Sequence, residues 1–312
     1  MKQQQMNSRA WLEMLLLGAI WGGVFLAVAL ALKEIPVFSL VTMRVGFAAV
    51  VLWGYVLFRG QQIPKGWKIW SALIVMGILN NAVPFTLLNF GQTQIESGLT
   101  SILNAGTVVF ATLISALFLK DERLTPQKLM GVALGMSGVI TVIGFQSLQT
   151  FDLRSLGQIA CIGATIFYAL AGVWARKHLK GISPAVSSAG MLTGSTLVMV
   201  PITIWLDGWP TWAYTGQTWL SLIYIVIIAT VVAYLLYFRV LNSAGASNTL
   251  LVTLVVPPIA VSLGALVLAE QLPLRSYLGF ALIAMALAVI DGRLWKLARR
   301  TFSSARSSSI PR

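Results

Sequence analysis

Long apolar stretches alternate with short polar joints along the whole chain. A membrane-spanning helix needs about 20 mainly apolar residues, and the 312-residue sequence divides into ten such stretches. The joints between them contain Pro, Gly or charged residues, which mark the ends of helices. The ten predicted spans are residues 11–32, 37–58, 70–90, 97–119, 127–145, 157–176, 185–206, 218–239, 247–268 and 275–295.

The composition supports a membrane protein. Hydrophobic residues make up 57% of the chain and charged residues 10%, with a mean hydropathy of +0.83. Soluble domains contain about 25% charged residues, so this chain cannot form a water-facing shell. Lys2 and Arg9 precede the first span and give it some likeness to a secretory signal, but the span is longer than a signal core of about 7–15 apolar residues. We therefore expect an all-α membrane protein that retains its first helix.

The net charge of +13 is distributed unevenly across the predicted spans. With a cytoplasmic N-terminus, eighteen of the 22 Lys and Arg residues lie on the inner side, three lie on the outer side, and Arg44 lies within a span. This asymmetry is the positive-inside pattern of membrane proteins and requires no nucleic-acid partner. It predicts a multi-pass protein, in contact with the lipid bilayer, with both termini cytoplasmic.

The two halves of the chain resemble each other at an offset of 148 residues. Glu122 then corresponds to Glu270, and Gly131 corresponds to Gly279. Each half holds five spans, and because five is odd the halves must enter the membrane in opposite senses, as in transporters with inverted repeats. The predicted organisation is a cytoplasmic N-terminus, two inverted five-helix repeats and a basic cytoplasmic tail, at residues 1–10, 11–145, 157–295 and 296–312 respectively.

Four sequence motifs also resemble a known family. They are AIWGGVF, FLKDERLTPQKLMGVALGMSGV, YLLYFRVLNSAGAS and LVLAEQLPLRSYLGFALI, which begin at Ala19, Phe118, Tyr234 and Leu266. Together they resemble the EamA-type branch of the drug/metabolite transporter superfamily. The resemblance implies a ten-helix inverted repeat with both termini inside, in a family whose members often export amino acids or other small metabolites. The halves differ at several motif positions. Pro257 in the second half is matched by Val109 in the first, the sequence Gln-Leu-Pro at 271–273 is matched by Arg-Leu-Thr at 123–125, and the second half has no counterpart of Arg44.

Two side chains lie deep within predicted spans and are candidates for ligand contact. Trp21 is ten residues into the first span, about 15 Å deep, where its ring could stack on a ligand and its N–H requires an acceptor. The alternative is packing beside Gly22 and Gly23. Arg44 lies about 12 Å into the second span and is a candidate for substrate binding or gating. Its alternatives are snorkelling toward the headgroups and bonding to backbone carbonyls.

Polar side chains within other spans complete the candidate site. Asn81, Phe85 and Asn89 follow a spacing of four, which predicts that they share one helix face. Interhelical hydrogen bonding, at about 0.6 kcal/mol each, is the alternative role for each amide. As a converging set, the polar residues favour a neutral or zwitterionic ligand. The predicted substrate-binding residues are Trp21, Arg44, Asn80, Asn81, Asn104, Thr107, Tyr168 and Thr253.

These features predict a secondary transporter of small molecules in a bacterial inner membrane, rather than an enzyme. That it exports its substrate is what the family resemblance implies. His178 is the single His and lies in a predicted loop, so the sequence offers no metal cluster or catalytic triad. No nucleotide-binding loop is present, and no cofactor is expected. Glu13, near the inner end of the first span, leaves proton coupling as an alternative. An uptake permease, a multidrug exporter and a non-transporting membrane scaffold are the other hypotheses, and no pattern sets an oligomeric state.

Overall fold

The computed structural model consists of helices joined by loops, with no strand in the part of the chain that it describes. Each of the ten predicted spans contains helix within that part. Two sequence-based predictions concern residues outside the described part of the chain. They are the correspondence of Glu270 with Glu122 and the basic tail at residues 296–312. The structure describes residues 7–95, 97–120, 122, 124–149, 152, 155–268 and 273–291.

The helices of the first predicted half reproduce its five spans, with the first, third and fourth spans each divided into two or three segments. The bounds are α1 (Ser8–Gly22), α2 (Val24–Ala31), α3 (Val37–Phe58), α4 (Trp67–Gly77), η1 (Ile78–Ala82), α5 (Val83–Gln92), α6 (Ser97–Ala105), α7 (Thr107–Phe118), α8 (Pro126–Ile143) and the short α9 (Gln146–Gln149).

The second half has the corresponding arrangement, and its third span is again interrupted by a π-helical segment. The bounds are α10 (Leu156–His178), α11 (Pro184–Leu206), α12 (Gly216–Ile223), η2 (Tyr224–Val232), α13 (Ala233–Ala244), α14 (Ala246–Thr249), α15 (Val252–Leu268) and α16 (Leu274–Asp291).

Seven helical stretches in the described residues are long and apolar enough to cross a membrane. They correspond to the first four predicted spans and to the sixth, seventh and eighth. The other three predicted spans are occupied by α8, α15 and α16, which are 18, 17 and 18 residues long. The prediction of an all-α protein with several membrane-spanning helices is therefore confirmed, whereas the crossing of the membrane by all ten stretches stays a prediction.

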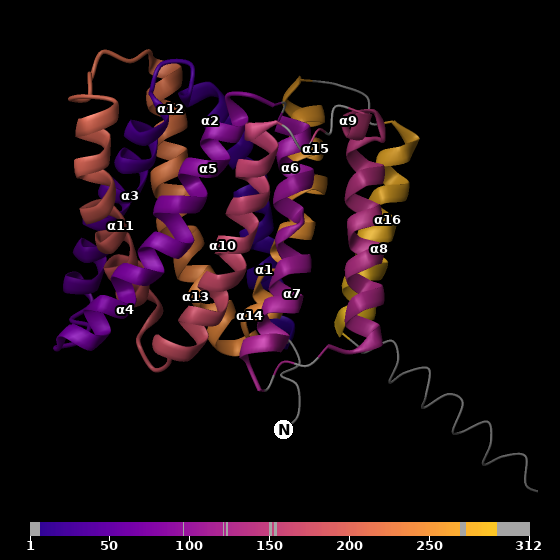
Figure 1. Cartoon of the computed structure of the whole chain (residues 1–312), viewed down its shortest axis with the longest axis horizontal. Helices are drawn as coiled ribbons and strands as arrows, with labels where there is room; N and C mark the ends of the chain where they lie inside the picture. Colours follow the sequence, from indigo (N-terminus) through magenta and orange to yellow (C-terminus); the bar gives the residue numbers. More distant parts are fainter. Residues whose placement is uncertain are drawn as a thin grey trace, which may run out of the picture.

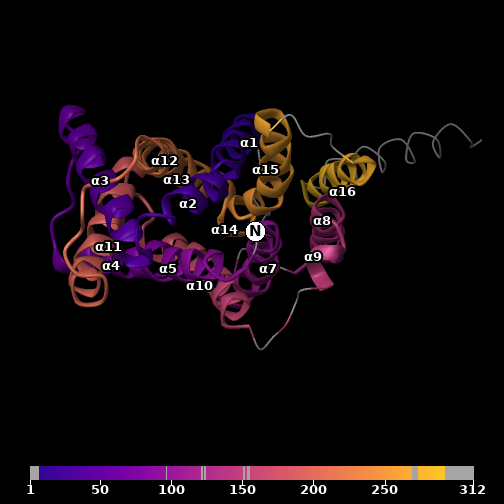
Figure 2. The same ribbon diagram turned by 90° about the horizontal axis from the view of Figure 1, so that it is seen from above.

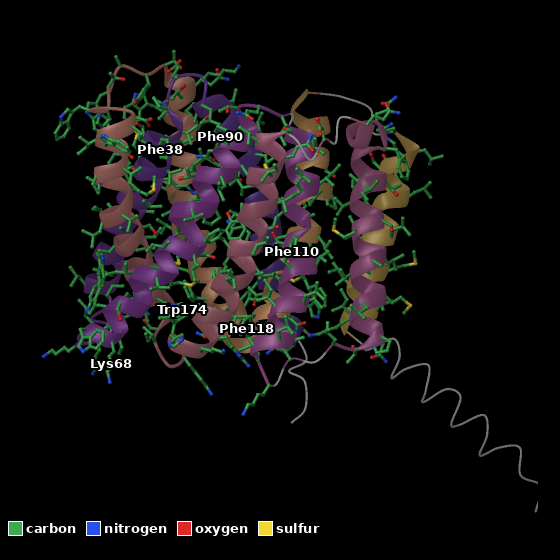
Figure 3. All side chains as sticks on the ribbon, viewed as in Figure 1. Phe38, Lys68, Phe90, Phe110, Phe118 and Trp174 are labelled. Carbon is green, nitrogen blue, oxygen red and sulfur yellow. The ribbon has the colours of Figure 1, made fainter. Side chains whose placement is uncertain are left out.

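Corresponding helices of the two halves run in opposite directions. In Figure 1 the stretch α4–η1–α5 runs from the lower edge to the upper edge, whereas α12–η2–α13 runs from the upper edge to the lower edge. Likewise α6–α7 descends and α14–α15 ascends (Figure 1). The chain enters α1 and leaves α16 at the lower edge, where Lys68 also extends away from the bundle (Figure 3).

The two halves are intertwined rather than placed side by side as separate bodies. The most extensive helix contacts are α8 with α16, α3 with α11, α5 with α10 and α7 with α10, and each of these pairs joins the first half to the second. Seen from above, α8 and α16 lie together at one end of the bundle, and α3, α4 and α11 lie at the other (Figure 2). Neither half can therefore bury its apolar faces without the other.

The α8–α16 pair depends on a close backbone approach at Gly279. A Cβ atom at this position would lie 2.5 Å from Cγ2 of Val142 and 2.7 Å from the carbonyl oxygen of Gly138. Real Cβ contacts are not this short, so a side chain here would force the helices apart. Small residues allow such approaches between membrane helices.

We therefore expect Gly279→Ala to destabilise the protein by about 1–3 kcal/mol, the usual cost of overpacking. Gly54→Ala is the matched control, because a Cβ at Gly54 would meet nothing within 4 Å. Thermal unfolding of both variants in detergent micelles measures the difference. Equal melting temperatures for the two variants would show that the α8–α16 contact is looser than described.

Candidate substrate cavity

A break in the first span positions Trp21 beside the centre of the bundle. Gly23 separates α1 from α2, and a Cβ there would lie 2.5 Å from the hydroxyl oxygen of Tyr224. The same hydroxyl donates a 2.7 Å hydrogen bond to the carbonyl of Ile20, at the end of α1. At the break, the carbonyl of Ile20 therefore accepts a hydrogen bond from a side chain of η2, in the other half of the chain.

A π-helical turn sets the polar face of the third span. In a π-helix the repeating hydrogen bond joins residues five apart rather than four. Across η1 this change aligns Asn80 with Phe85, and the following α-helical spacing aligns Phe85 with Asn89. All three side chains line the same cavity. The sequence-based grouping of Asn81 with Phe85 and Asn89 was wrong, because it assumed an uninterrupted α-helix.

The second π-helical segment, η2, binds the two deep polar side chains of the first half. The indole N–H of Trp21 donates to the carbonyl of Ala229 at 3.1 Å. Arg44 donates from Nε to the hydroxyl of Thr230 at 2.9 Å and from Nη2 to the carbonyl of Ala229 at 3.4 Å. Arg44 is only 5% exposed, so these bonds replace part of the hydration that its charge has lost.

These side chains enclose a cavity between the two halves, with about 730 Å³ of space free of protein atoms, including space open to the surroundings. Among the described lining residues, Arg44 is the only one with a formal charge. The lining residues are Trp21, Val24, Phe25, Val28, Arg44, Asn80, Phe85, Leu88, Asn89, Gln92, Asn104, Tyr168, Tyr234, Tyr237, Leu250, Thr253 and Val256.

Aromatic rings form much of one wall. The ring of Trp21 lies 6.5 Å from that of Tyr234 and 6.1 Å from that of Tyr237, and the two tyrosine rings are 6.1 Å apart. Phe85 lies directly against Arg44, with the guanidinium carbon 3.8 Å from the ring centre. Such a wall can pack against an apolar group or bind a cation over the face of a ring.

The chain matches the model of the EamA-like transporter family twice, over residues 9–144 and 155–290. The chain belongs to the EamA-like transporter family. The family resemblance expected from the motifs is thereby confirmed, as is a two-repeat architecture. The family's members are transporters, which agrees with the expectation of a non-enzyme.

Named relatives of this EamA-like chain span most of its length. The uncharacterized transporter YoaV of Bacillus subtilis is 25% identical over 264 residues, covering 85% of this chain and 90% of the relative. A probable amino-acid metabolite efflux pump of Escherichia coli is 26% identical over 294 residues, covering 91% and 95%. One crystal structure superposes with a TM-score of 0.75 at 18% identity, over 91% of this chain and 98% of the other, and shows that the fold is shared.

The cavity of this family member brings together six of the eight residues predicted for the site. The other two, Asn81 and Thr107, are fully buried outside it. The Asn81 amide donates to Ser195 at 2.9 Å, and its oxygen accepts a bond from Tyr234. Thr107 donates to the carbonyl of Asn104 at 2.7 Å. The structure therefore places both in contacts within the bundle. The six residues at the cavity are Trp21, Arg44, Asn80, Asn104, Tyr168 and Thr253.

Four lining residues with polar side chains were not among the predicted eight. Tyr234 and Tyr237 lie three residues apart in the YLLYF motif, a spacing that places both on one face of α13. Nothing in the sequence distinguishes them from the other aromatic and aliphatic residues of this long apolar span. Asn89 and Gln92 have the same spacing near the end of α5, and their polarity inside a span was the available signal.

Two acidic residues near helix ends, Glu13 and Glu122, form ion pairs away from the cavity. Glu13 lies 3.2 Å from Nε of Arg9 and 3.5 Å from Nε of Arg239, so it joins α1 to α13 near the lower edge. Glu122 lies 3.6 Å from the ammonium of Lys128, across the joint between α7 and α8. These contacts agree with a bracing role for both carboxylates.

Thr253 and Thr107 provide a matched pair that tests the position of the cavity. Both are buried, and each hydroxyl bonds to the carbonyl three residues earlier, but only Thr253 lines the cavity. In a Cys161→Ser background, we expect Thr253→Cys to react with a small charged methanethiosulfonate reagent in the folded protein. Thr107→Cys should react only after unfolding, as followed by mass spectrometry. Equal reactivity of the two folded variants would contradict this location.

Proposed function

We propose that this chain is a secondary transporter that moves a small zwitterionic or neutral metabolite, such as an amino acid, by alternating access. The observation that carries the proposal is the cavity between the two halves, with Arg44 and several amides among apolar and aromatic side chains. Membership of a transporter family supports the class of activity. The name of the Escherichia coli relative, an amino-acid metabolite efflux pump, favours export and this substrate class.

In this proposal all ten helical stretches cross the inner membrane, and residues 11–145 and 157–295 are inverted repeats. The opposite directions of α4–η1–α5 and α12–η2–α13 support the inversion (Figure 1). The excess of Lys and Arg at the ends predicted to be inside supports cytoplasmic termini. In known inverted-repeat transporters the substrate binds near the membrane midplane, where the repeats meet.

Contacts between the halves at both edges are candidates for the gates. At the upper edge Glu34 accepts bonds from the Thr215 amide at 2.9 Å and its hydroxyl at 2.8 Å, which hold the pKa of the Glu34 carboxyl below its usual range. At the lower edge the Glu13–Arg239 pair joins α1 to α13. Alternating access requires that contacts at one edge break while those at the other remain. In this scheme Glu13 is a gate residue, and proton coupling through it is the alternative role.

A flux experiment in cells tests transport and its direction. We expect overexpression to lower the internal level of the substrate and raise its level in the medium, and deletion to do the reverse, as measured by untargeted mass spectrometry. The opposite signs would indicate an uptake permease, and export of several unrelated drugs would indicate a multidrug exporter. An unchanged profile with normal membrane insertion would favour the scaffold hypothesis and contradict transport.

A substitution at Trp21 tests whether that flux depends on the cavity. We expect Trp21→Ala to reduce flux at least about tenfold, equivalent to about 1.4 kcal/mol, because it removes both a cavity wall and the bond to Ala229. Trp205→Ala is the control, since Trp205 is 82% exposed at the end of α11. Both variants are compared at equal membrane levels. Unchanged flux in Trp21→Ala would show that Trp21 only packs and that the site lies elsewhere.

A further inference from the structure

Arg44 has no counter-charge within the described part of the chain. None of the ion pairs found there includes it, and no other described residue of the cavity lining carries a charge. An ionised group that is withdrawn from water without a partner is costly. A fold that retains such a cation at a cavity wall is suited to a ligand that supplies the missing negative charge.

The guanidinium also keeps donors free in its own plane. Of its five N–H groups, Nε binds Thr230 and one N–H of Nη2 binds Ala229, whereas Nη1 makes no hydrogen bond to a described residue. Phe85 covers one face of the group at 3.8 Å. Approach in the plane, toward Nη1 and Nη2, is the geometry in which guanidinium binds both oxygens of a carboxylate.

Two other polar atoms of the cavity residues point to a second ligand group. The amide oxygen of Asn104 and the hydroxyl of Tyr237 are buried and have no hydrogen-bond partner among the described residues. Both side chains are more than nine-tenths buried, at 8% and 1% exposure, and both line the cavity. An amide oxygen only accepts hydrogen bonds, so its complement is an N–H or O–H donor such as an ammonium group.

We propose that the cavity recognises a zwitterion through separate subsites, with Arg44 binding its carboxylate and Asn104, assisted by Tyr237, binding its ammonium group. The apolar remainder of the ligand then packs on the aromatic wall formed by Trp21 and Tyr234. The substrate class is an α-amino acid with an apolar side chain. This inference rests on the proposed function and narrows it, because neutral compounds without a carboxylate and simple cations would leave Arg44 unpaired.

Calorimetry on the purified full chain in detergent micelles tests these subsites. The probe is whichever of valine, leucine, isoleucine, methionine and phenylalanine gives the largest thermal stabilisation, together with its amide and its deaminated acid. We expect the amide to bind about 100-fold more weakly, as for loss of one partner of a buried charge pair. The deaminated acid should bind about tenfold more weakly. Failure of all five amino acids to stabilise the protein, or equal binding of acid and amide, would overturn the inference.

Variants assign each group to its subsite. Arg44→Gln should abolish the preference for the amino acid over its amide, and Arg44→Lys should restore part of it. Asn104→Leu leaves Arg44 intact and so remains informative if Arg44→Gln does not fold. It should weaken binding of the amino acid about tenfold without changing binding of the deaminated acid. Equal weakening of both ligands would contradict the ammonium subsite. Ser188→Ala is the control, because Ser188 is buried outside the cavity and its hydroxyl bonds only to the carbonyl of Pro184 among the described residues.

The flux screen separates this inference from the proposed function. Export of a compound without a carboxylate would support the transporter and overturn the zwitterion subsites. Specific binding of the amino acid by a folded protein that moves nothing would support the subsites and overturn the transporter. Flux of an apolar amino acid that is lost in Arg44→Gln and retained in Ser188→Ala would support both.

Discussion

The cost of holding the Arg44 charge inside an apolar helical bundle is the constraint on which the rest of the site depends. Scales from membrane insertion put a cation at the centre of a spanning helix at about 2.5–3.5 kcal/mol. The structure reduces this cost with acceptors from the opposite half, the hydroxyl of Thr230 and the carbonyl of Ala229. Trp21 donates to the same carbonyl. One short segment of η2 therefore anchors both Trp21 and Arg44.

Both halves use an irregular third span to build this centre. η1 aligns Asn80 with Phe85, and η2 supplies the acceptors for Trp21 and Arg44. Irregular backbone within a membrane is tolerated where it is enclosed by protein or lines a cavity, and π-helical turns are frequent at functional sites. The paired interruptions, together with the break at Gly23, give the two halves a shared core of non-standard helix around the cavity.

The sequence was sufficient to predict the helices and the depth of the main polar groups. Long apolar stretches fix the spans because a bilayer requires them, and Arg44 and Trp21 stand out because charge and indole are unusual at that depth. Which side chains of the third span line the cavity was not predictable. Asn80 and Asn81 are adjacent and chemically identical, and only the π-helical turn decides that Asn80 lines the cavity. Tyr234 and Tyr237 were missed because an aromatic residue within an apolar span is equally consistent with facing lipid and with lining a cavity.

A crystal structure of the protein with the exported compound bound would test whether the cavity around Arg44 is the transport site. We predict that the compound occupies the space between the two halves, with its carboxylate within hydrogen-bond distance of the Arg44 guanidinium and its apolar part against Trp21. A compound bound elsewhere, with the cavity collapsed or filled by lipid, would show that transport does not use this site.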